Sequence, residues 1–302
     1  LFFKKIYFNF MQLKYYAAAL FSFVVWGAFS LVLRPLSDYA ALDILTYRVA
    51  FAAVIIALIS LIFRYRITKE NISLIISLAP NDRLKIISAT IFSAIMLALN
   101  WYLYIYVMNA VSVNATSLAY LICPILTTVL ASIFLKEKLN AGQWTAVALS
   151  VLSCVMLSYG HFIDMVYSVI IALSYAIYLV VQKASKKLDK FFTLTLHILI
   201  SSLFLIPLGM NSGEAVTHSD QFFQYVLIIA VFFTIIPLFL NMYALKGLDS
   251  SLVGVLLYIN PIIAFLLAIF YFDENITLLQ GLAYGLIFTA VIVFNVSYLQ
   301  GK

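Results

Sequence analysis

Charged residues are scarce in this chain of 302 residues. Only 10% of the residues are charged, whereas 65% are hydrophobic. A soluble globular domain carries about 25% charged residues, so water would not keep this composition in solution. The scarcity of charge excludes an ordinary soluble domain and favours a protein that lies within a lipid bilayer.

Further absences narrow the function. The only cysteines are Cys123 and Cys154, which have no CxxC spacing and no clustered histidines, so the sequence predicts neither a disulfide framework nor a metal site. P-loop, HExxH and GxSxG motifs are absent, and no carboxylate pair lies within an apolar run. We therefore expect no ATP-driven motor, no enzyme and no cofactor.

The chain contains several long hydrophobic runs. A membrane-spanning helix needs roughly 20 mostly apolar residues, and helices satisfy every backbone group within their own segment. Strands of a membrane barrel are shorter, at about 10 alternating residues. The predicted spans are residues 14–33, 43–63, 85–108, 113–135, 141–159, 162–182, 191–209, 222–245, 250–272 and 277–299. The sequence thus predicts an all-α membrane protein with ten transmembrane helices.

The first run could also be read as a secretory signal peptide, because basic residues precede it. The run is longer than a typical signal core, and no small-residue cleavage site follows it. We expect it to remain as a span. Met11 stands directly before this run, which is consistent with residues 1–10 being an upstream extension.

Basic residues gather in the loops on one side of these spans. The positive-inside rule assigns such loops to the cytoplasm. This side holds 16 of the 18 basic residues: Lys4, Lys5, Lys14, Arg64, Arg66, Lys69, Arg83, Lys85, Lys136, Lys138, Lys183, Lys186, Lys187, Lys190, Lys246 and Lys302. We therefore expect a multi-pass protein of the inner (plasma) membrane with both termini cytoplasmic. The net charge of +6 then indicates no nucleic-acid partner.

An internal repeat divides the chain. Residues 120–125 recur as residues 257–262, which is an offset of 137 residues, and at the same offset Glu137 meets Glu274 and Gln143 meets Gln280. The two units are residues 1–160 and 161–302, with five spans each. Because five is odd, the second unit inserts upside down relative to the first. Inverted repeats are typical of secondary transporters.

Several segments resemble a known family. Residues 43–48 (DILTYR), 100–105 (NWYLYI), 117–124 (SLAYLICP) and 134–139 (FLKEKL) are similar to conserved segments of RarD-type proteins of the EamA family, in the drug/metabolite transporter superfamily. In the second half, residues 174–178 and 258–261 match in the same order. The resemblance implies ten helices, two inverted five-helix units and transport of small metabolites.

The chain departs from this resemblance at several polar positions. Tyr47 stands where the family tends to have His, Cys123 replaces an Asn, and Gln182 stands in place of an Arg. The seventh span lacks the Glu that the family usually has there. Roles that belong to those side chains do not transfer to this chain.

Arg48 is the first candidate for a substrate-binding residue. A central Arg in a membrane helix costs about 2.5–3.5 kcal/mol on insertion scales. The structural interpretation is that Arg48 reaches the outer interface or pairs with Asp43, five residues earlier. The functional interpretation is an anchor for an anionic or carboxylate group of a substrate.

Polar and aromatic residues form stripes at helical spacing on several spans. Residues four apart share a helix face, so these stripes avoid lipid and either line a cavity between the halves or join helices by hydrogen bonds. Trp101 is a further candidate because its ring could stack on a substrate. The candidates of this group are Asn100, Trp101, Tyr104, Tyr120, Tyr178, Asn241 and Tyr258.

His197 and two prolines complete the set of candidates. Histidine titrates near neutral pH, so His197 is either a packed or interfacial residue or a proton-coupling group at the site. Pro124 and Pro261 are repeat mates inside spans. A proline removes a helical hydrogen bond, so we expect paired kinks, which are either hinges or static packing features.

Taken together, the sequence predicts a secondary transporter, an exporter or exchanger, of small polar or amphipathic metabolites. Its site is expected at the midplane between the halves, and its partners are a small-molecule substrate and the lipid bilayer. The alternative is a non-transporting membrane scaffold or a membrane enzyme. The sequence indicates neither the substrate nor an oligomeric state.

Overall fold

The computed structural model describes residues 2–110, 113–159, 162–184, 187–210, 218–271 and 277–300. Within these ranges the regular structure is helical and no strand occurs. This confirms the predicted all-α class. The predicted boundary between the two units, at residues 160–161, and the repeat mate Glu274 lie outside the described residues.

The elements follow one another in a simple order. In the first half they are α1 (Phe2–Gly27), α2 (Phe29–Leu33), the 3-10 turn η1 (Arg34–Leu36), α3 (Ala41–Leu58), the π-helical segment η2 (Ile59–Phe63), α4 (Tyr65–Ser77), α5 (Pro80–Ala110), α6 (Val113–Phe134) and α7 (Ala141–Ser158). In the second half they are α8 (Phe162–Ala184), α9 (Lys190–Met210), α10 (Asp220–Ala230), the π-helical segment η3 (Val231–Ile235), α11 (Ile236–Gly247), α12 (Ser250–Leu256), α13 (Ile259–Phe270) and α14 (Leu278–Gln300).

Most of the predicted spans recur as long apolar helices. The described residues contain nine stretches that are long and apolar enough to cross a membrane. The predicted span 113–135 coincides with α6, whose apolar stretch among the residues searched is the shorter Leu118–Phe134. The count of ten spans therefore stays a prediction.

The connection between the second and third spans is not a simple loop. Residues 65–77 form α4, and α5 already begins at Pro80. Polar residues such as Arg66 and Glu70 are exposed on α4, but so are Ile72 and Ile76. This mixture is typical of a helix that lies at a membrane interface. The sequence did not predict α4 because it contains no apolar run of 20 residues.

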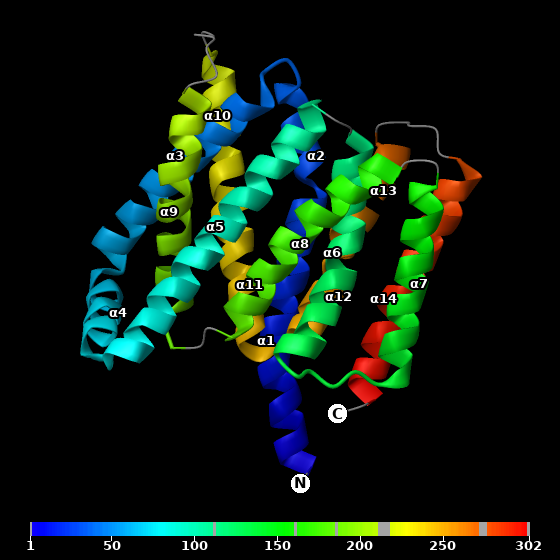
Figure 1. The fold of residues 1–302 in the computed structure, drawn as a ribbon, viewed down its shortest axis with the longest axis horizontal. Coiled ribbons are helices and arrows are strands. Elements are labelled where there is room, and N and C mark those ends of the chain that lie inside the picture. The colour runs from blue at the N-terminus through cyan, green and yellow to red at the C-terminus, as the bar shows by residue number, and fades with distance from the viewer. Residues whose placement is uncertain are drawn as a thin grey trace.

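The helices form one bundle in which both chain termini lie at the same end (Figure 1). We call this end the terminal end and the other the distal end. α4 and the start of α5 lie at the terminal end, whereas α10 and the start of α3 lie at the distal end (Figure 1). The pair α7 and α14 closes one side of the bundle.

Packing runs across the boundary between the two halves. The most extensive contacts join α6 to α8, α7 to α14, α1 to α11 and α3 to α9, and each pair takes one helix from each half. The halves are thus interleaved, and the core lies between them. The buried side chains at this junction include Tyr178 and Tyr258.

α7 and α14 begin with the same capping motif. The side-chain Oδ1 of Asn140 accepts from the Gln143 backbone N–H, and the side-chain Oε1 of Gln143 accepts from the Asn140 backbone N–H, both at 2.9 Å. Thr277 and Gln280 repeat this reciprocal pair before α14, at 2.9 and 3.2 Å. Such a capping box satisfies backbone donors that a helix start leaves without partners.

The same two helices run in opposite directions. The Asn140 amide donates to the Ser297 carbonyl at 2.8 Å, and the Ser153 hydroxyl donates to the Ala283 carbonyl at 2.8 Å. Position 140 thus faces the end of α14 and position 153 faces its beginning. The two capping boxes therefore lie at opposite ends of the bundle.

Pro237 in α11 connects the second half to α1. Proline has no N–H, so Pro237 donates no hydrogen bond to the Phe233 carbonyl four residues earlier. The Trp26 indole N–H donates to that carbonyl at 2.9 Å, and the Ser22 hydroxyl donates to the Pro237 carbonyl at 2.9 Å. Side chains of α1 thus supply donors to backbone acceptors around the proline.

Glu137 joins the halves at the terminal end. Its carboxylate accepts from the backbone N–H of Ser250 at 2.7 Å and from that of Ser251 at 3.0 Å, and the Ser251 hydroxyl adds a third bond at 2.6 Å. The carboxylate therefore caps the start of α12 from the loop that follows α6. A negative charge at a helix N-terminus is favourable.

We expect Glu137→Ala to lower the melting temperature of the purified protein. The substitution leaves the first N–H groups of α12 uncapped, and loss of a helix cap costs about 0.5–2 kcal/mol. Glu70→Ala is the matched control, because the partner of Glu70 among the described residues is exposed Arg66, at 2.9 Å on the surface of α4. Equal shifts for the two variants in a thermal unfolding assay would contradict the assignment.

Candidate functional site

Arg48 lies within a membrane-spanning helix beside aromatic rings from two other helices. Its guanidinium carbon is 4.9 Å from the centre of the Trp101 ring of α5, which is a cation–π distance. The hydroxyls of Tyr104 and Tyr120 are near enough to interact electrostatically with its charge. The rings of these two tyrosines are 5.5 Å apart. We call Arg48, Trp101, Tyr104 and Tyr120 the arginine cluster.

The hydrogen bonding of Arg48 is incomplete. Its Nε is buried and has no hydrogen-bond partner in the described part of the chain. An unpartnered buried donor costs about 1–3 kcal/mol, and more when it is charged. All four members of the arginine cluster nevertheless keep partial solvent accessibility, so the charge is not sealed within a packed core. The arrangement offers a cationic donor to an incoming acceptor.

The arginine cluster lies nearer the distal end than the predicted midplane. Arg48 and Tyr120 each follow the start of their helix by seven residues, and Trp101 precedes the end of α5 by nine. At 1.5 Å per residue these positions are about 10–14 Å from the distal ends of the helices. The cluster therefore sits at one depth, within reach of the distal surface.

Asp43 has a different partner from the one considered in the sequence. Its carboxylate is 3.4 Å from Nε2 of His218, and Arg48 forms no ion pair with any described residue. The His218 ring packs against Tyr39 and Phe222, with centroids 5.7 and 4.2 Å away. Sequence reasoning missed His218, because its contacts with α3 join segments far apart in the chain.

A second group surrounds His197 between α8 and α9. Nδ1 of His197 is 3.5 Å from the Tyr178 hydroxyl, and Nε2 is 3.4 Å from the Gln182 amide nitrogen. His197 is fully buried. The surroundings are those of a packed histidine, which was one of the two interpretations, and the proton-coupling role stays a prediction.

Tyr175 connects these two groups, although the sequence did not single it out as a site residue. Its ring is 5.7 Å from that of Tyr178 and 6.2 Å from that of Trp26 on α1. It also interacts electrostatically with Tyr120. A signal was present, because Tyr175 precedes Tyr178 by three residues and so shares its helix face. An aromatic row thus extends from the arginine cluster to His197.

Several buried polar groups near the junction of the halves lack partners among the described residues. Both amide atoms of Asn241, the hydroxyls of Tyr175 and Tyr258, and Oε1 of Gln182 belong to this set. Buried polar groups are usually hydrogen-bonded. Bound water or a polar ligand would satisfy these atoms, so the junction is a polar region within an apolar bundle.

Asn100 differs from these groups because its amide is satisfied. Its Nδ2 donates to the Ile171 carbonyl at 3.0 Å and to the Ser174 hydroxyl at 3.2 Å. These bonds join α5 to α8, as expected for a polar residue that joins helices. A direct contact of Asn100 with substrate stays a prediction.

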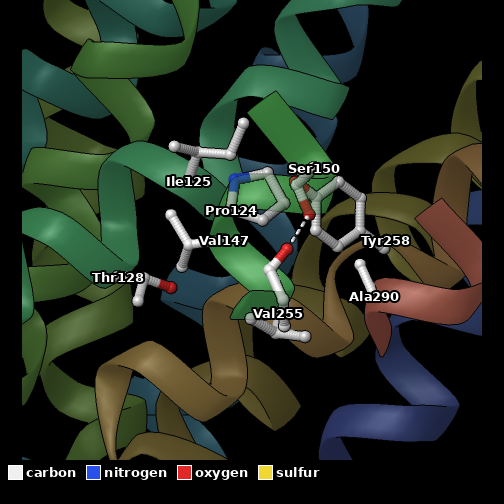
Figure 2. A pocket seen from close by; sticks show the side chains of 9 residues that line it. Pro124, Ile125, Thr128, Val147, Ser150, Val255, Tyr258 and Ala290 are labelled. Atoms are coloured by element: carbon white, nitrogen blue, oxygen red, sulfur yellow. Dashed lines mark hydrogen bonds between the residues drawn. The ribbon is translucent and has the colours of Figure 1, made fainter. Parts of the chain in front are cut away.

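Tyr258 and Pro124 border a cavity that is too small for a metabolite (Figure 2). Its volume is about 10 Å³, which is roughly the space of one water molecule. In Figure 2 the Tyr258 ring lies beside Ser150, with Pro124 and Val255 on either side. The cavity suits a single water near the unpartnered Tyr258 hydroxyl, and it holds no metabolite.

The two repeat-mate prolines differ in their surroundings. Pro124 lies inside α6, which continues through it without a break. Pro261 lies in the first turn of α13, directly after the chain leaves the α12 helix at Leu257 and Tyr258. Only the second half is thus interrupted at this position. Whether either proline acts as a hinge stays a prediction.

A much larger cavity of about 730 Å³ lies toward the terminal end. It is bordered by α5, α6, α8 and the beginning of α9, and no member of the arginine cluster lines it. In the described part of the chain, no group of three or more His, Cys, Asp or Glu residues is placed to hold a metal.

Comparison with known proteins now assigns the chain to a family. The sequence profile of the EamA-like transporter family matches residues 13–159 and again residues 163–296. The chain belongs to the EamA-like transporter family. Its membership confirms the resemblance seen in the sequence, and it makes this chain a membrane protein of a transporter family.

Individual relatives of this EamA-like protein extend over nearly its whole length. The chain is 27% identical to the uncharacterized transporter YojE of Bacillus subtilis, over 93% of each chain. It is 26% identical to the protein RarD of Escherichia coli, over 91% of this chain and 92% of RarD. A crystal structure with 12% identity covers 92% of this chain and 94% of its own, with a TM-score of 0.73, which shows a shared fold.

We expect Gly254→Leu to destabilise the EamA-like protein where α12 meets α6. A Cβ atom at Gly254 would lie 2.9 Å from Thr127 and 3.5 Å from the Pro124 carbonyl oxygen. Overpacking of this kind costs about 1–3 kcal/mol. Gly285→Leu on α14 is the control, because a Cβ there meets nothing within 4 Å. The melting temperature should fall only for the first variant, and an equal fall in both would disprove the close approach.

Proposed function

We propose that this protein is a secondary transporter that exports or exchanges small amphipathic metabolites with an anionic group. The observation that carries the proposal is the unpartnered Nε of Arg48 at membrane depth. A charged side chain within a membrane is costly and usually marks a functional site. A substrate anion would supply the missing acceptor and neutralise the charge.

The chemistry of the arginine cluster suits a carboxylate. A guanidinium presents its N–H donors in a planar fork that binds a carboxylate through two hydrogen bonds. The Trp101 ring lies 4.9 Å from the guanidinium carbon and stabilises its charge by a cation–π contact. The tyrosine hydroxyls add donors for the anion, and their rings provide an apolar surface for the rest of the substrate.

An inverted repeat of ten helices is the architecture that we propose for transport. The two consecutive family matches support a division into residues 1–160 and 161–302. The capping boxes of α7 and α14 support it as well, because they recur at the 137-residue offset and lie at opposite ends of the bundle. Such a repeat allows two related conformations that open to opposite sides of the membrane.

Alternating access requires the helices to separate at each end in turn. At the terminal end, the contact between Glu137 and the start of α12 is a candidate closure, because opening there would break its three hydrogen bonds. Pro124 and the interruption before Pro261 are the proposed flexible points. The arginine cluster lies nearer the distal end, so in this proposal substrate enters or leaves from that side.

The proposed orientation places the terminal end in the cytoplasm. Arg64, Arg66, Lys69 and Arg83 lie in or beside α4 and the start of α5 at this end, whereas Asp38 and Asp43 flank the distal start of α3. The excess of basic residues supports a cytoplasmic terminal end.

Arg48→Ala should weaken recognition of the substrate. Charge-assisted hydrogen bonds contribute about 1.5–3 kcal/mol, so the apparent affinity should fall by about 10- to 150-fold. The screen uses thermal shift of the purified protein with a panel of small carboxylates, amino acids and their uncharged amides. Counterflow of each compound that stabilises the protein is then measured in proteoliposomes.

Arg66→Ala is the control for Arg48→Ala, because Arg66 is a fully exposed arginine of α4. Arg48→Lys keeps the charge but not the fork, so it should retain only part of the affinity. Counterflow that is equal in wild type and Arg48→Ala would refute the role of Arg48. If no compound of the panel moves, the scaffold interpretation gains support instead.

The orientation can be tested by labelling single cysteines in whole cells. In a chain whose buried Cys123 and Cys154 are replaced by alanine, Asp38→Cys and Lys69→Cys place exposed thiols at the distal and terminal ends. A membrane-impermeant maleimide should label only the Asp38→Cys variant, and both variants should react after lysis. The reverse pattern would overturn the proposed orientation.

A further inference from the structure

The large cavity near the terminal end is a groove between α5 and α6 with α8 behind it. We call it the α5–α6 groove. Figure 1 shows α5 and α6 diverging toward the terminal end. The groove has a volume of about 730 Å³, within the range of ligand sites. Its lining comes from α5, the end of α6, α8 and the residues around the start of α9.

The α5–α6 groove is separate from the arginine cluster along α5. Its lining on this helix ends at Phe92. Ser93, Ala94 and Leu97 follow and are completely buried. Trp101 and Tyr104 come after this packed turn. A ligand in the groove would therefore not touch Arg48 in this conformation.

The interior of the groove is apolar in effect. Its inner polar residues are Thr90 and Thr193. The Thr90 hydroxyl donates to the Ile86 carbonyl, and the Thr193 hydroxyl donates to the Asp189 carbonyl, both at 2.8 Å. The hydroxyl donors are thus already used. The remaining inner lining is hydrocarbon, so the groove matches an apolar chain better than a polar metabolite.

Charge is confined to one end of the groove. Asp82 and Lys187 form an ion pair at 3.1 Å, which joins the start of α5 to the residues before α9. Lys85, one turn after Asp82, is exposed and forms no ion pair with any described residue. The end of the groove therefore carries one ammonium group whose charge no described carboxylate balances.

The side of the groove is accessible from outside the bundle. Phe92 of α5 and Phe134 of α6 line the groove and are 44% and 70% exposed. Phe92 lies on a candidate membrane span and Phe134 at the end of the apolar helix α6, so their exposed rings suit contact with acyl chains. A molecule within the bilayer can therefore reach the groove sideways.

We propose that the α5–α6 groove binds an anionic phospholipid, with its phosphate at Lys85 and an acyl chain along the apolar lining. Basic sites between membrane helices on the cytoplasmic side are suited to anionic head groups. The assignment to the cytoplasmic leaflet rests on the proposed orientation. Binding itself depends only on the groove, its free ammonium group and its access from the bilayer.

Lipid retention and thermal shift of the full chain in detergent test this proposal. Phosphatidylglycerol should raise the melting temperature and stay bound in native mass spectrometry, whereas phosphatidylcholine with the same chains should do so far less. Lys85→Gln should reduce retained phosphatidylglycerol about fivefold, because a lysine near the head groups contributes about 1 kcal/mol. Lys69→Gln, an exposed lysine of α4 at the same end, should leave retention unchanged.

Two further measurements distinguish the possible occupants of the groove. Glycerol 3-phosphate carries the anion without acyl chains, so it should not stabilise the protein, and stabilisation equal to that by the lipid would overturn the chain-binding groove. Ala89→Trp should fill the groove and displace phosphatidylglycerol. Unchanged retention in this variant, or equal retention of phosphatidylcholine, would also overturn the proposal.

The lipid assay contains no metabolite, so its outcome does not depend on the proposed transport function. Failure of counterflow would leave lipid binding intact. Loss of counterflow in Ala89→Trp together with unchanged phosphatidylglycerol binding would instead identify the groove as part of the substrate path.

Discussion

Every polar group that enters the bilayer with this chain needs a partner, and that constraint determines how the helices meet. Trp26 donates to the Phe233 carbonyl beside Pro237, Ser153 donates to the Ala283 carbonyl, and Ser201 donates to the Ala94 carbonyl at 3.1 Å. Each bond joins the first half to the second. Because lipid offers no hydrogen bonds in exchange, these contacts bring the helices into a particular register, which apolar packing alone would specify less well.

The same constraint makes the exceptions informative. Nε of Arg48, both amide atoms of Asn241 and the hydroxyl of Tyr258 are buried, yet they have no partner among the described residues. In a bundle that otherwise uses side chains to satisfy its carbonyls, such atoms are costly unless something else binds them. Tyr258 lies at the junction of the two halves, whereas the aromatic neighbours of Arg48 come from α5 and α6 of the first half.

Hydropathy was sufficient to predict most of the architecture, because a run of 20 apolar residues has few alternatives to a membrane helix. The register of the repeat likewise identified Gln143 and Gln280 as equivalent, and both contribute to capping boxes. α4 was missed because it has no such run. Helical spacing identified Tyr104 and Tyr120 as candidates, but it did not predict that they would share one depth with Arg48.

The remaining features depend on contacts between helices, which the spacing of residues along the sequence does not reveal. A helical stripe indicates which residues share a face, but not which helix covers that face. The pairing of Asp43 with His218 and the bonds of Asn100 to α8 join residues from distant parts of the chain. For this reason the sequence placed Asn100 with the ligand-binding candidates, whereas the structure uses its amide to connect two helices.

The interleaving of the halves has a consequence for biogenesis. The carbonyl that accepts from Trp26 lies 207 residues further along the chain, so it is still unsynthesised when α1 leaves the ribosome. The helices of the first half therefore lack these partners until the second half has been synthesised and inserted. A fragment that ended midway would expose the polar groups that the second half otherwise satisfies.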